Sequence, residues 1–238
     1  MTEQLRDILQ SSNNIVFFGG AGVSTESGIP DFRSADGLYN AQYAHPPEVM
    51  LSHSFFMRHT SEFFCFYREK MIYRNARPNK AHEALAELER QGKLKAVITQ
   101  NIDGLHTLAG SKNVLELHGS VYRNYCMLCG KSYTLDALLS AADVPLCVCG
   151  GIIKPDVVLY EEGLDQDVLE ASARALQEAE VLIVGGTSLN VYPAAGLIRY
   201  YGGDKLILIN KSETPYDSSA GLVIRENIGE TLHKALAG

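Results

Sequence analysis

The 238-residue sequence lacks several features that mark other classes of protein. It has no excess of positive charge, since 28 Asp and Glu outnumber 21 Lys and Arg, so no basic surface marks DNA or RNA as the main ligand. It has no apolar run near the ~18 residues of a membrane-spanning helix. Residues 1–7 contain neither the basic region nor the apolar run of a signal peptide. We therefore expect a cytoplasmic protein with no membrane partner and no direct nucleic-acid binding.

Internal repeats, low-complexity tracts and long Pro/Gly/Ser linkers are absent as well. With 46% hydrophobic residues, a chain of this length can bury a full core, and it predicts one large domain or one large and one small domain. Because no linker divides the chain, a second domain would have to be an insertion within the first. We expect a monomer.

Short apolar runs alternate with helix-like stretches, which predicts a doubly wound α/β fold with a parallel sheet. Three of the runs end in small or polar residues, as parallel strands do where they face a ligand crevice, and a fourth ends at Asn210. The predicted strands are 15–18, 96–99, 181–184 and 206–209, and the predicted helices include 81–90 and 168–178. Residues 54–73 and 122–152 do not fit the alternation, so we expect them to form a small inserted domain.

A glycine-rich turn follows the first predicted strand, in the sequence Gly-Gly-Ala-Gly-Val-Ser-Thr-Glu-Ser-Gly-Ile-Pro-Asp-Phe-Arg of residues 19–33. Glycines let the backbone turn sharply and approach a pyrophosphate, whose charge is met by amides at the following helix N-terminus. Thr25 stands where the dehydrogenase fingerprint has a glycine, so a tight turn without a ligand is the alternative. Asp31, Phe32 and Arg33 favour binding, because packing alone rarely puts these three side chains in one turn.

Polar side chains also follow the second predicted strand, in Thr-Gln-Asn-Ile-Asp-Gly-Leu-His of residues 99–106. Gln100, Asn101 and Asp103 offer donors and acceptors that suit a ribose and a carboxamide, and the alternative is a polar helix cap. His118 lies further along, just before the cysteine-bearing segment. A lone histidine is more often structural, but this one falls where a cleft should form, and an ordinary pKa of about 6.5 suits a general base.

Four of the five cysteines form two close pairs, Cys126-x-x-Cys129 and Cys147-x-Cys149, each next to glycine. In a reducing compartment such pairs indicate a metal site before they indicate disulfides. Four thiolates suit tetrahedral zinc and leave no position for water or substrate, which predicts one structural Zn²⁺. We expect the fifth cysteine, Cys65, to lie in the core.

Taken together, these motifs resemble those of the sirtuin family over nearly the whole chain. The matching segments, in the family's order, are 20–33, 99–106, His118-Gly119, the four cysteines, Gly186-Thr187-Ser188-Leu189 and 193–196. The resemblance implies a Rossmann-like NAD-binding domain and a small domain made of a zinc ribbon and a helical module. The first would comprise residues 1–36, 79–119 and 154–238, and the second the insertions 37–78 and 120–153.

The resemblance further implies an NAD-dependent protein lysine deacetylase that acts on acyl-lysine proteins or peptides. In that reaction the acyl oxygen attacks the ribose carbon as nicotinamide leaves, and His118 deprotonates a ribose hydroxyl that then attacks the imidate. The products would be free lysine, nicotinamide and O-acyl-ADP-ribose. Asn101 and Asp103 would be catalytic together with His118. A closed cleft suits this chemistry because it shields an oxocarbenium-like transition state from water.

Within the NAD site implied by the resemblance, Phe32 would shield the reactive ribose carbon and Asp103 would hold the carboxamide. The expected NAD-binding residues are Gly20, Ala21, Gly22, Ser24, Thr25, Asp31, Phe32, Arg33, Gln100, Asn101, Ile102, Asp103, His118, Gly186, Thr187, Ser188, Asn210 and Ile228.

A substrate peptide would bind as an added strand between the stretch Val157, Val158, Leu159, Tyr160 and the loop 189–192. Two departures from the family affect this site. Tyr160-Glu161-Glu162 replaces the usual Phe-Gly-Glu, which leaves peptide preference open. Phe64 and Tyr67 occupy the places of the Tyr-x-x-Arg that marks desuccinylating sirtuins, so we expect them to contact a neutral acyl group such as acetyl rather than succinyl.

Three other classes of protein stay open at this point. A protein ADP-ribosyltransferase would begin with the same cleavage of NAD. A nucleotide sensor or a zinc-ribbon interaction protein would bind without turnover, which the presence of His118, Asn101 and Asp103 disfavours. A hydride-transferring dehydrogenase is disfavoured because neither a separate substrate domain nor a catalytic zinc is evident.

Overall fold

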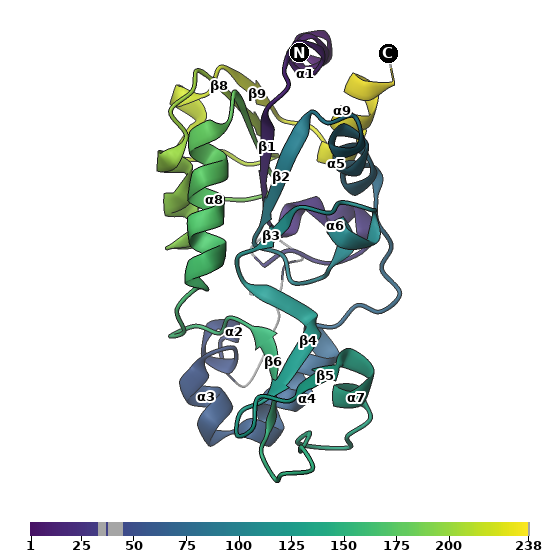
Figure 1. The fold of residues 1–238 in the computed structure, drawn as a ribbon, viewed down its shortest axis with the longest axis vertical. Coiled ribbons are helices and arrows are strands. Elements are labelled where there is room, and N and C mark those ends of the chain that lie inside the picture. Colours follow the sequence, from purple (N-terminus) through teal and green to yellow (C-terminus); the bar gives the residue numbers. More distant parts are fainter. Residues whose placement is uncertain (33–36, 38–44, 238) are drawn as a thin grey trace.

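The computed structural model describes residues 1–32, 37 and 45–237, and within them the chain forms two β-sheets (Figure 1). The larger sheet has six parallel strands in the order β3-β2-β1-β7-β8-β9. Its strands are β1 (Ile15–Gly19), β2 (Leu94–Thr99), β3 (Val114–Glu116), β7 (Val181–Gly185), β8 (Lys205–Ile209) and β9 (Leu222–Ile224). The predicted doubly wound α/β fold is therefore confirmed.

The chain winds outward from β1 in both directions, first through β2 and β3 and then through β7, β8 and β9. The order in which successive strands are added reverses between β1 and β7. Open parallel sheets bind ligands at such a reversal point, beyond the carboxyl ends of the strands. The four predicted strands are present as β1, β2, β7 and β8. Strands β3 and β9, three residues each at the two edges, were not predicted.

Helices cover both faces of the larger sheet because its strands are apolar on both sides. In β1, Ile15 and Phe17 pack into the cluster below α1, α5 and α9, whereas Val16 and Phe18 pack under α8 and the 3₁₀ segment η4. Figure 1 shows α8 and α5 on opposite sides of the sheet. The bounds are α1 Thr2–Ser11, α5 Lys80–Arg90, α6 Leu105–Leu108, α8 Gln166–Glu178, η4 Ala194–Tyr200 and α9 Ile228–Leu236.

The smaller sheet is antiparallel, in the order β5-β4-β6, and lies beyond the carboxyl ends of the larger one (Figure 1). Its elements and the helices around it are α2 Pro47–Met50, α3 His53–Arg58, α4 Thr60–Lys70, β4 Gly119–Cys126, β5 Ser132–Thr134, α7 Leu135–Leu139 and β6 Ile153–Val157. The expected insertion of residues 120–153 does not coincide with these strands, because β4 begins one residue before it and β6 continues beyond its end. The division of the chain into two domains at the limits given above remains a proposal.

Aromatic side chains of α3 and α4 form the core of this smaller part. Phe56, Phe63 and Phe64 meet edge to face, and Tyr67 stacks on Phe63. Cys65 lies on the opposite face of α4 and is exposed, so the expectation that it is a core residue was wrong. One residue along an α-helix turns the side chain by about 100°, which takes Cys65 away from its buried neighbours. None of the described helices is long and apolar enough to span a membrane.

Candidate active site

The glycine-rich turn lies where the strand order reverses. After β1 the chain forms two successive 3₁₀ turns, η1 (Ala21–Val23) and η2 (Thr25–Ser27), in place of the long helix that a dinucleotide-binding turn usually precedes. The amide of Gly22 donates to the carbonyl of Gly186 over 2.8 Å, and a Cβ on Gly22 would lie 2.8 Å from the Cα of Gly186. The loops after β1 and β7 therefore meet backbone to backbone, and glycine is needed for that approach.

A cleft of about 630 Å³ opens above this turn, between the two sheets. Every described residue that was predicted to bind NAD lines it, from Gly20 in the turn to Ile228 at the start of α9. The predicted peptide-binding stretch, from Val157 to Tyr160, lines the same cleft. Arg33 lies outside the described residues. The sequence motifs therefore meet in one place, although their individual roles remain proposals.

A hydrogen-bonded group of three polar side chains lies in this cleft. Ser24 Oγ donates to Asp103 Oδ2 over 2.6 Å, and Asn101 Nδ2 donates to Ser24 Oγ over 3.1 Å. Asp103 Oδ1 accepts from the amide of Leu105 over 2.9 Å, so the carboxylate also caps the turn, as the alternative interpretation expected. Burial raises the pKa of Asp103, and the bonds from Ser24 and Leu105 oppose this rise. These bonds fix the orientation of the carboxylate.

His118 is placed by a single hydrogen bond. Its Nδ1 lies 2.9 Å from the carbonyl oxygen of Gln100. Because a carbonyl only accepts, Nδ1 carries the proton, and Nε2 of the neutral ring is the basic nitrogen. Burial lowers the pKa of His118, and the bond to Gln100 opposes this in part. His118 is therefore neutral at pH 7 and able to accept a proton.

Gln100 also connects the ends of two strands. Its Nε2 donates to Thr187 Oγ1 over 3.0 Å, which joins the loop after β2 to the loop after β7. Thr187 Oγ1 in turn accepts from the amide of Leu189 over 3.2 Å. At the other end of the cleft, the Asn210 side chain donates to the carbonyl of Ser212. Polar groups at three strand ends are thus held in fixed directions along the cleft.

The stretch after β6 forms the wall of the cleft nearest His118. The amide of Val158 donates to the His118 carbonyl over 3.0 Å, and the amide of Tyr160 donates to the Leu51 carbonyl over 3.0 Å. Val157 and Leu159 are buried in the aromatic cluster, whereas Val158 and Tyr160 are more exposed. Among the described residues, no group donates a hydrogen bond to the Val158 carbonyl oxygen. An acceptor beside His118 is therefore open to an added strand.

Phe64 and Tyr67 are not part of this cleft. Both side chains are 0% exposed inside the aromatic cluster and neither lines the cleft, so the expectation that they contact the acyl group is corrected. Their helical phase turns them into the core, where burial raises the pKa of Tyr67. The Arg68 guanidinium lies over the Phe64 ring and donates to the Asp143 carbonyl, also away from the cleft.

The end of α4 and the residues just after it supply cleft residues that the sequence analysis missed. Lys70, Met71 and Tyr73 line the wall, together with Leu51. Lys70 Nζ lies 2.6 Å from the carboxylate of Glu69, so this ammonium already has an anionic neighbour. No motif marks these positions in the sequence.

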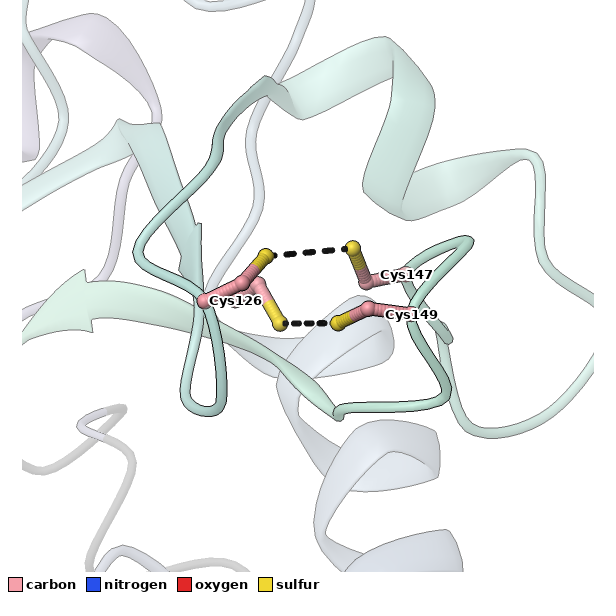
Figure 2. A group of neighbouring side chains, drawn as sticks. Cys126, Cys147 and Cys149 are labelled. Carbon is pink, nitrogen blue, oxygen red and sulfur yellow. Dashed lines mark hydrogen bonds between the residues drawn. The ribbon is translucent and has the colours of Figure 1, made fainter.

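The four paired cysteines cluster at the far end of β4. Their Sγ atoms all lie within 4.8 Å of one another, with 3.4 Å between Cys126 and Cys149 and 3.7 Å between Cys129 and Cys147. Figure 2 shows the sulfurs of the two pairs facing each other. A zinc–sulfur distance of about 2.3 Å gives tetrahedral sulfur–sulfur edges of about 3.8 Å, so the four thiolates fit Zn²⁺. The predicted structural zinc site is supported by this geometry.

A parallel sheet with a cleft at its reversal point, together with an inserted segment whose four cysteines fit zinc, is typical of a dinucleotide-binding protein with a metal-binding insertion. Residues 20–193 match the model of the Sir2 family. The chain belongs to this family, which confirms the sirtuin resemblance.

Relatives of known name are similar over nearly their full length. An NAD-dependent protein deacetylase of Clostridium acetobutylicum is 63% identical over 237 residues, which are 98% of this chain and 97% of that protein. A solved complex of Sir2 with a p53 peptide and NAD⁺ is 42% identical, with a TM-score of 0.87 and coverage of 100% of this chain and 98% of the other. A Sir2 complex with a deacetylated p53 peptide and 3′-O-acetyl-ADP-ribose is 41% identical, with a TM-score of 0.90 and coverage of 99% and 97%.

Proposed function

We propose that this protein is an NAD-dependent protein lysine deacetylase that transfers the acetyl group to ADP-ribose and releases nicotinamide. The observation that carries the proposal is the bond from His118 Nδ1 to the Gln100 carbonyl, which leaves a basic Nε2 in the wall of the cleft. The names of relatives that match nearly the full chain support the same activity.

Different residues of the cleft act on the two substrates, NAD and the acyl-lysine peptide. NAD supplies an electrophilic ribose carbon when its nicotinamide departs. Asp103 and Asn101, fixed through Ser24, hold the carboxamide and ribose, while Phe32, which packs against the aromatic cluster, excludes water from the ribose carbon. The acyl oxygen attacks the ribose carbon as nicotinamide leaves, which gives an imidate. His118 Nε2 accepts the proton of a ribose hydroxyl, which attacks the imidate carbon, and addition of water then releases the lysine amine and leaves the acyl group on ADP-ribose.

The acyl-lysine peptide binds along the wall beside His118. The open carbonyl of Val158 accepts a backbone hydrogen bond from the peptide, and Val191 and Tyr192, which also line the cleft, are placed to contact it from the loop after β7. Main-chain bonds carry little sequence information, so we expect a broad range of peptide sequences. We also propose that neutral acyl groups other than acetyl are removed.

The test is incubation with NAD and an acetyl-lysine peptide, with nicotinamide, deacetylated peptide and O-acetyl-ADP-ribose followed by mass spectrometry. We expect the unchanged protein to form all three products in equal amounts. The variant His118→Ala should form none of them but should still bind NAD, as measured by calorimetry. His233→Ala, which changes an exposed histidine of α9, should keep full activity. ADP-ribose attached to protein, with no deacetylated peptide, would assign the chain to the ADP-ribosyltransferases instead.

A further inference from the structure

A buried ion pair lies behind the wall that we assign to the peptide. Lys154, on β6, is only 4% exposed. Its Nζ donates to Glu162 Oε2 over 3.0 Å, to the Val157 carbonyl over 3.0 Å and to the Pro155 carbonyl over 3.3 Å. The ammonium group has three protons, and all three are used. A charge buried to this extent is stable only while these partners stay in place.

Glu162 connects the ion pair to two other segments. Besides Lys154, its Oε2 accepts from the amide of Leu159 over 2.9 Å, and its Oε1 lies 2.8 Å from His53 Nδ1 at the start of α3. Burial alone would raise the pKa of Glu162, but the bonds from Leu159 and His53 and the charge of Lys154 outweigh it and lower the pKa. The carboxylate is therefore ionised at pH 7 and joins β6, the wall and the helical module.

The bonds from this pair fall on both sides of Val158. Lys154 holds the carbonyl of Val157, and Glu162 holds the amide of Leu159. Val158 itself carries the open carbonyl and donates its amide to the His118 carbonyl. The ion pair thus fixes the two peptide units that set the direction of the open acceptor, without contacting Ser24, Asn101 or Asp103.

We propose that Lys154 and Glu162 form a positioning pair that sets the affinity of this enzyme for its acyl-lysine peptide and leaves its affinity for NAD unchanged. This inference rests on the proposed function. Glu162 lines the cleft but Lys154 does not, so Lys154 acts through Glu162 and the backbone of residues 157–159 and not by contact with substrate, which makes Lys154 the decisive position for the test. The pair also transmits the position of β6 in the cysteine-bearing sheet to the peptide wall.

The principal variant is Lys154→Met, which keeps a long apolar stem and leaves the Glu162 carboxylate without its cation. We expect KM for an acetylated peptide to rise about tenfold or more, the usual cost of a lost bond to a charged partner, while KM for NAD changes less than about twofold. The dissociation constant of a fluorescent acetylated peptide, measured by anisotropy without NAD, should rise in parallel. Lys154→Arg, which keeps the charge, should restore most of the affinity.

Three further variants distinguish the positioning role from a general loss of folding. Glu162→Gln has the size of the native side chain and should show the same selective rise, and the double variant should cost no more than the worse single variant if the two act as one unit. Arg74→Gln breaks an ion pair with Asp136 that is exposed on the same small domain, and it should leave both KM values unchanged.

The outcomes separate this inference from the proposed function. If the unchanged protein produces no deacetylated peptide, the proposed function fails. If it is active and Lys154→Met binds peptide as well as the unchanged protein does, the positioning role is overturned. Equal losses for peptide and NAD, with a lower melting temperature that Lys154→Arg does not correct, would also overturn it by showing a purely structural pair.

Discussion

The imidazole rings of His82 and His106 meet edge to face with their centroids 4.7 Å apart, behind the glycine-rich turn. Both side chains are nearly fully buried. His82 Nδ1 accepts from the amide of Asn79 at the start of α5, and the Asn79 side chain donates to the Val23 carbonyl and to Ser27. The pair is therefore connected to the floor of the cleft. Burial lowers the pKa of His82 to about 4, and burial together with the charge of His82 lowers that of His106 to about 3.

This pair makes stability depend on pH below the ordinary histidine pKa. In the unfolded chain both residues take up protons below about pH 6.5, whereas in the folded protein they stay neutral down to about pH 4 and 3. The free energy of unfolding should thus fall as pH drops through this window, by up to about 1.4 kcal/mol per pH unit for each histidine. Urea unfolding at pH 7.5, 6.5, 5.5 and 4.5 measures it.

In the variant His106→Phe, the slope of the free energy of unfolding against pH should decrease by the amount that corresponds to about one proton. The variant His233→Gln, on the exposed face of α9, should keep the original slope. Parallel curves for the unchanged protein and His106→Phe would show that these histidines do not carry the effect.

The pH dependence of catalysis should reflect His118. Only the neutral imidazole accepts a proton, and burial lowers its pKa. The acid limb of kcat/KM should therefore lie below pH 6.5, with a plateau through pH 7. Deacetylation rates between pH 5 and 8 at low peptide concentration give this profile, with zinc content checked at each pH. A half-maximal rate above pH 7 would rule out His118 in a buried site as the base.

Removal of the metal should unfold the smaller sheet. Each chain should bind one zinc ion, and Cys147→Ser should lose it together with deacetylase activity, because structural zinc contributes about 10–16 kcal/mol in small zinc domains. Metal analysis and thermal unfolding measure both effects. Cys65→Ser is the matched control, since that cysteine is exposed on α4 and outside the cluster. Zinc retained in Cys147→Ser, or lost in Cys65→Ser, would contradict the assignment.

Acetyl- and propionyl-lysine peptides should react at least about tenfold faster, in kcat/KM, than a succinyl-lysine peptide, because no bidentate guanidinium from α4 lines the described cleft. Lys70 is the cation of α4 that does line it, and its ammonium lies 2.6 Å from Glu69. A panel of peptides that differ only in the acyl group measures the preference. Succinyl turnover equal to acetyl turnover would contradict it, and its loss in Lys70→Met would then identify the anion-binding group.

Much of the fold and of the cleft could be predicted because the residues that mark each strand end and each binding motif are close together in the sequence. The apolar runs that became β1, β2, β7 and β8 end in polar or glycine residues, and that pattern alone places them at one edge of a sheet. The three-residue strands β3 and β9 are too short to show a pattern of their own. Cytoplasmic location and a monomeric state stay predictions.

The acyl pocket could not be predicted in the same way. A motif match gave Phe64 and Tyr67 the places of an acyl-binding pair, but both lie inside the aromatic cluster, and Lys70 and Met71 at the end of α4 line the cleft instead. Which part of α4 reaches the cleft depends on how α3 and α4 pack on the smaller sheet, which no short motif records. The ion pair of Lys154 and Glu162 was missed for a similar reason, since the partners are eight positions apart in the sequence and only the fold buries them together.

Strand β4 begins at Gly119, immediately after His118, and ends at Cys126 in the four-cysteine cluster. Gly119 has a φ of +74° and lies so close to the Asp156 carbonyl that any Cβ would collide with it. His118 is thus held from both sheets, because its ring lies against the Gln100 carbonyl after β2 and its backbone carbonyl accepts from the Val158 amide after β6. The alignment of this base therefore depends on both sheets at once.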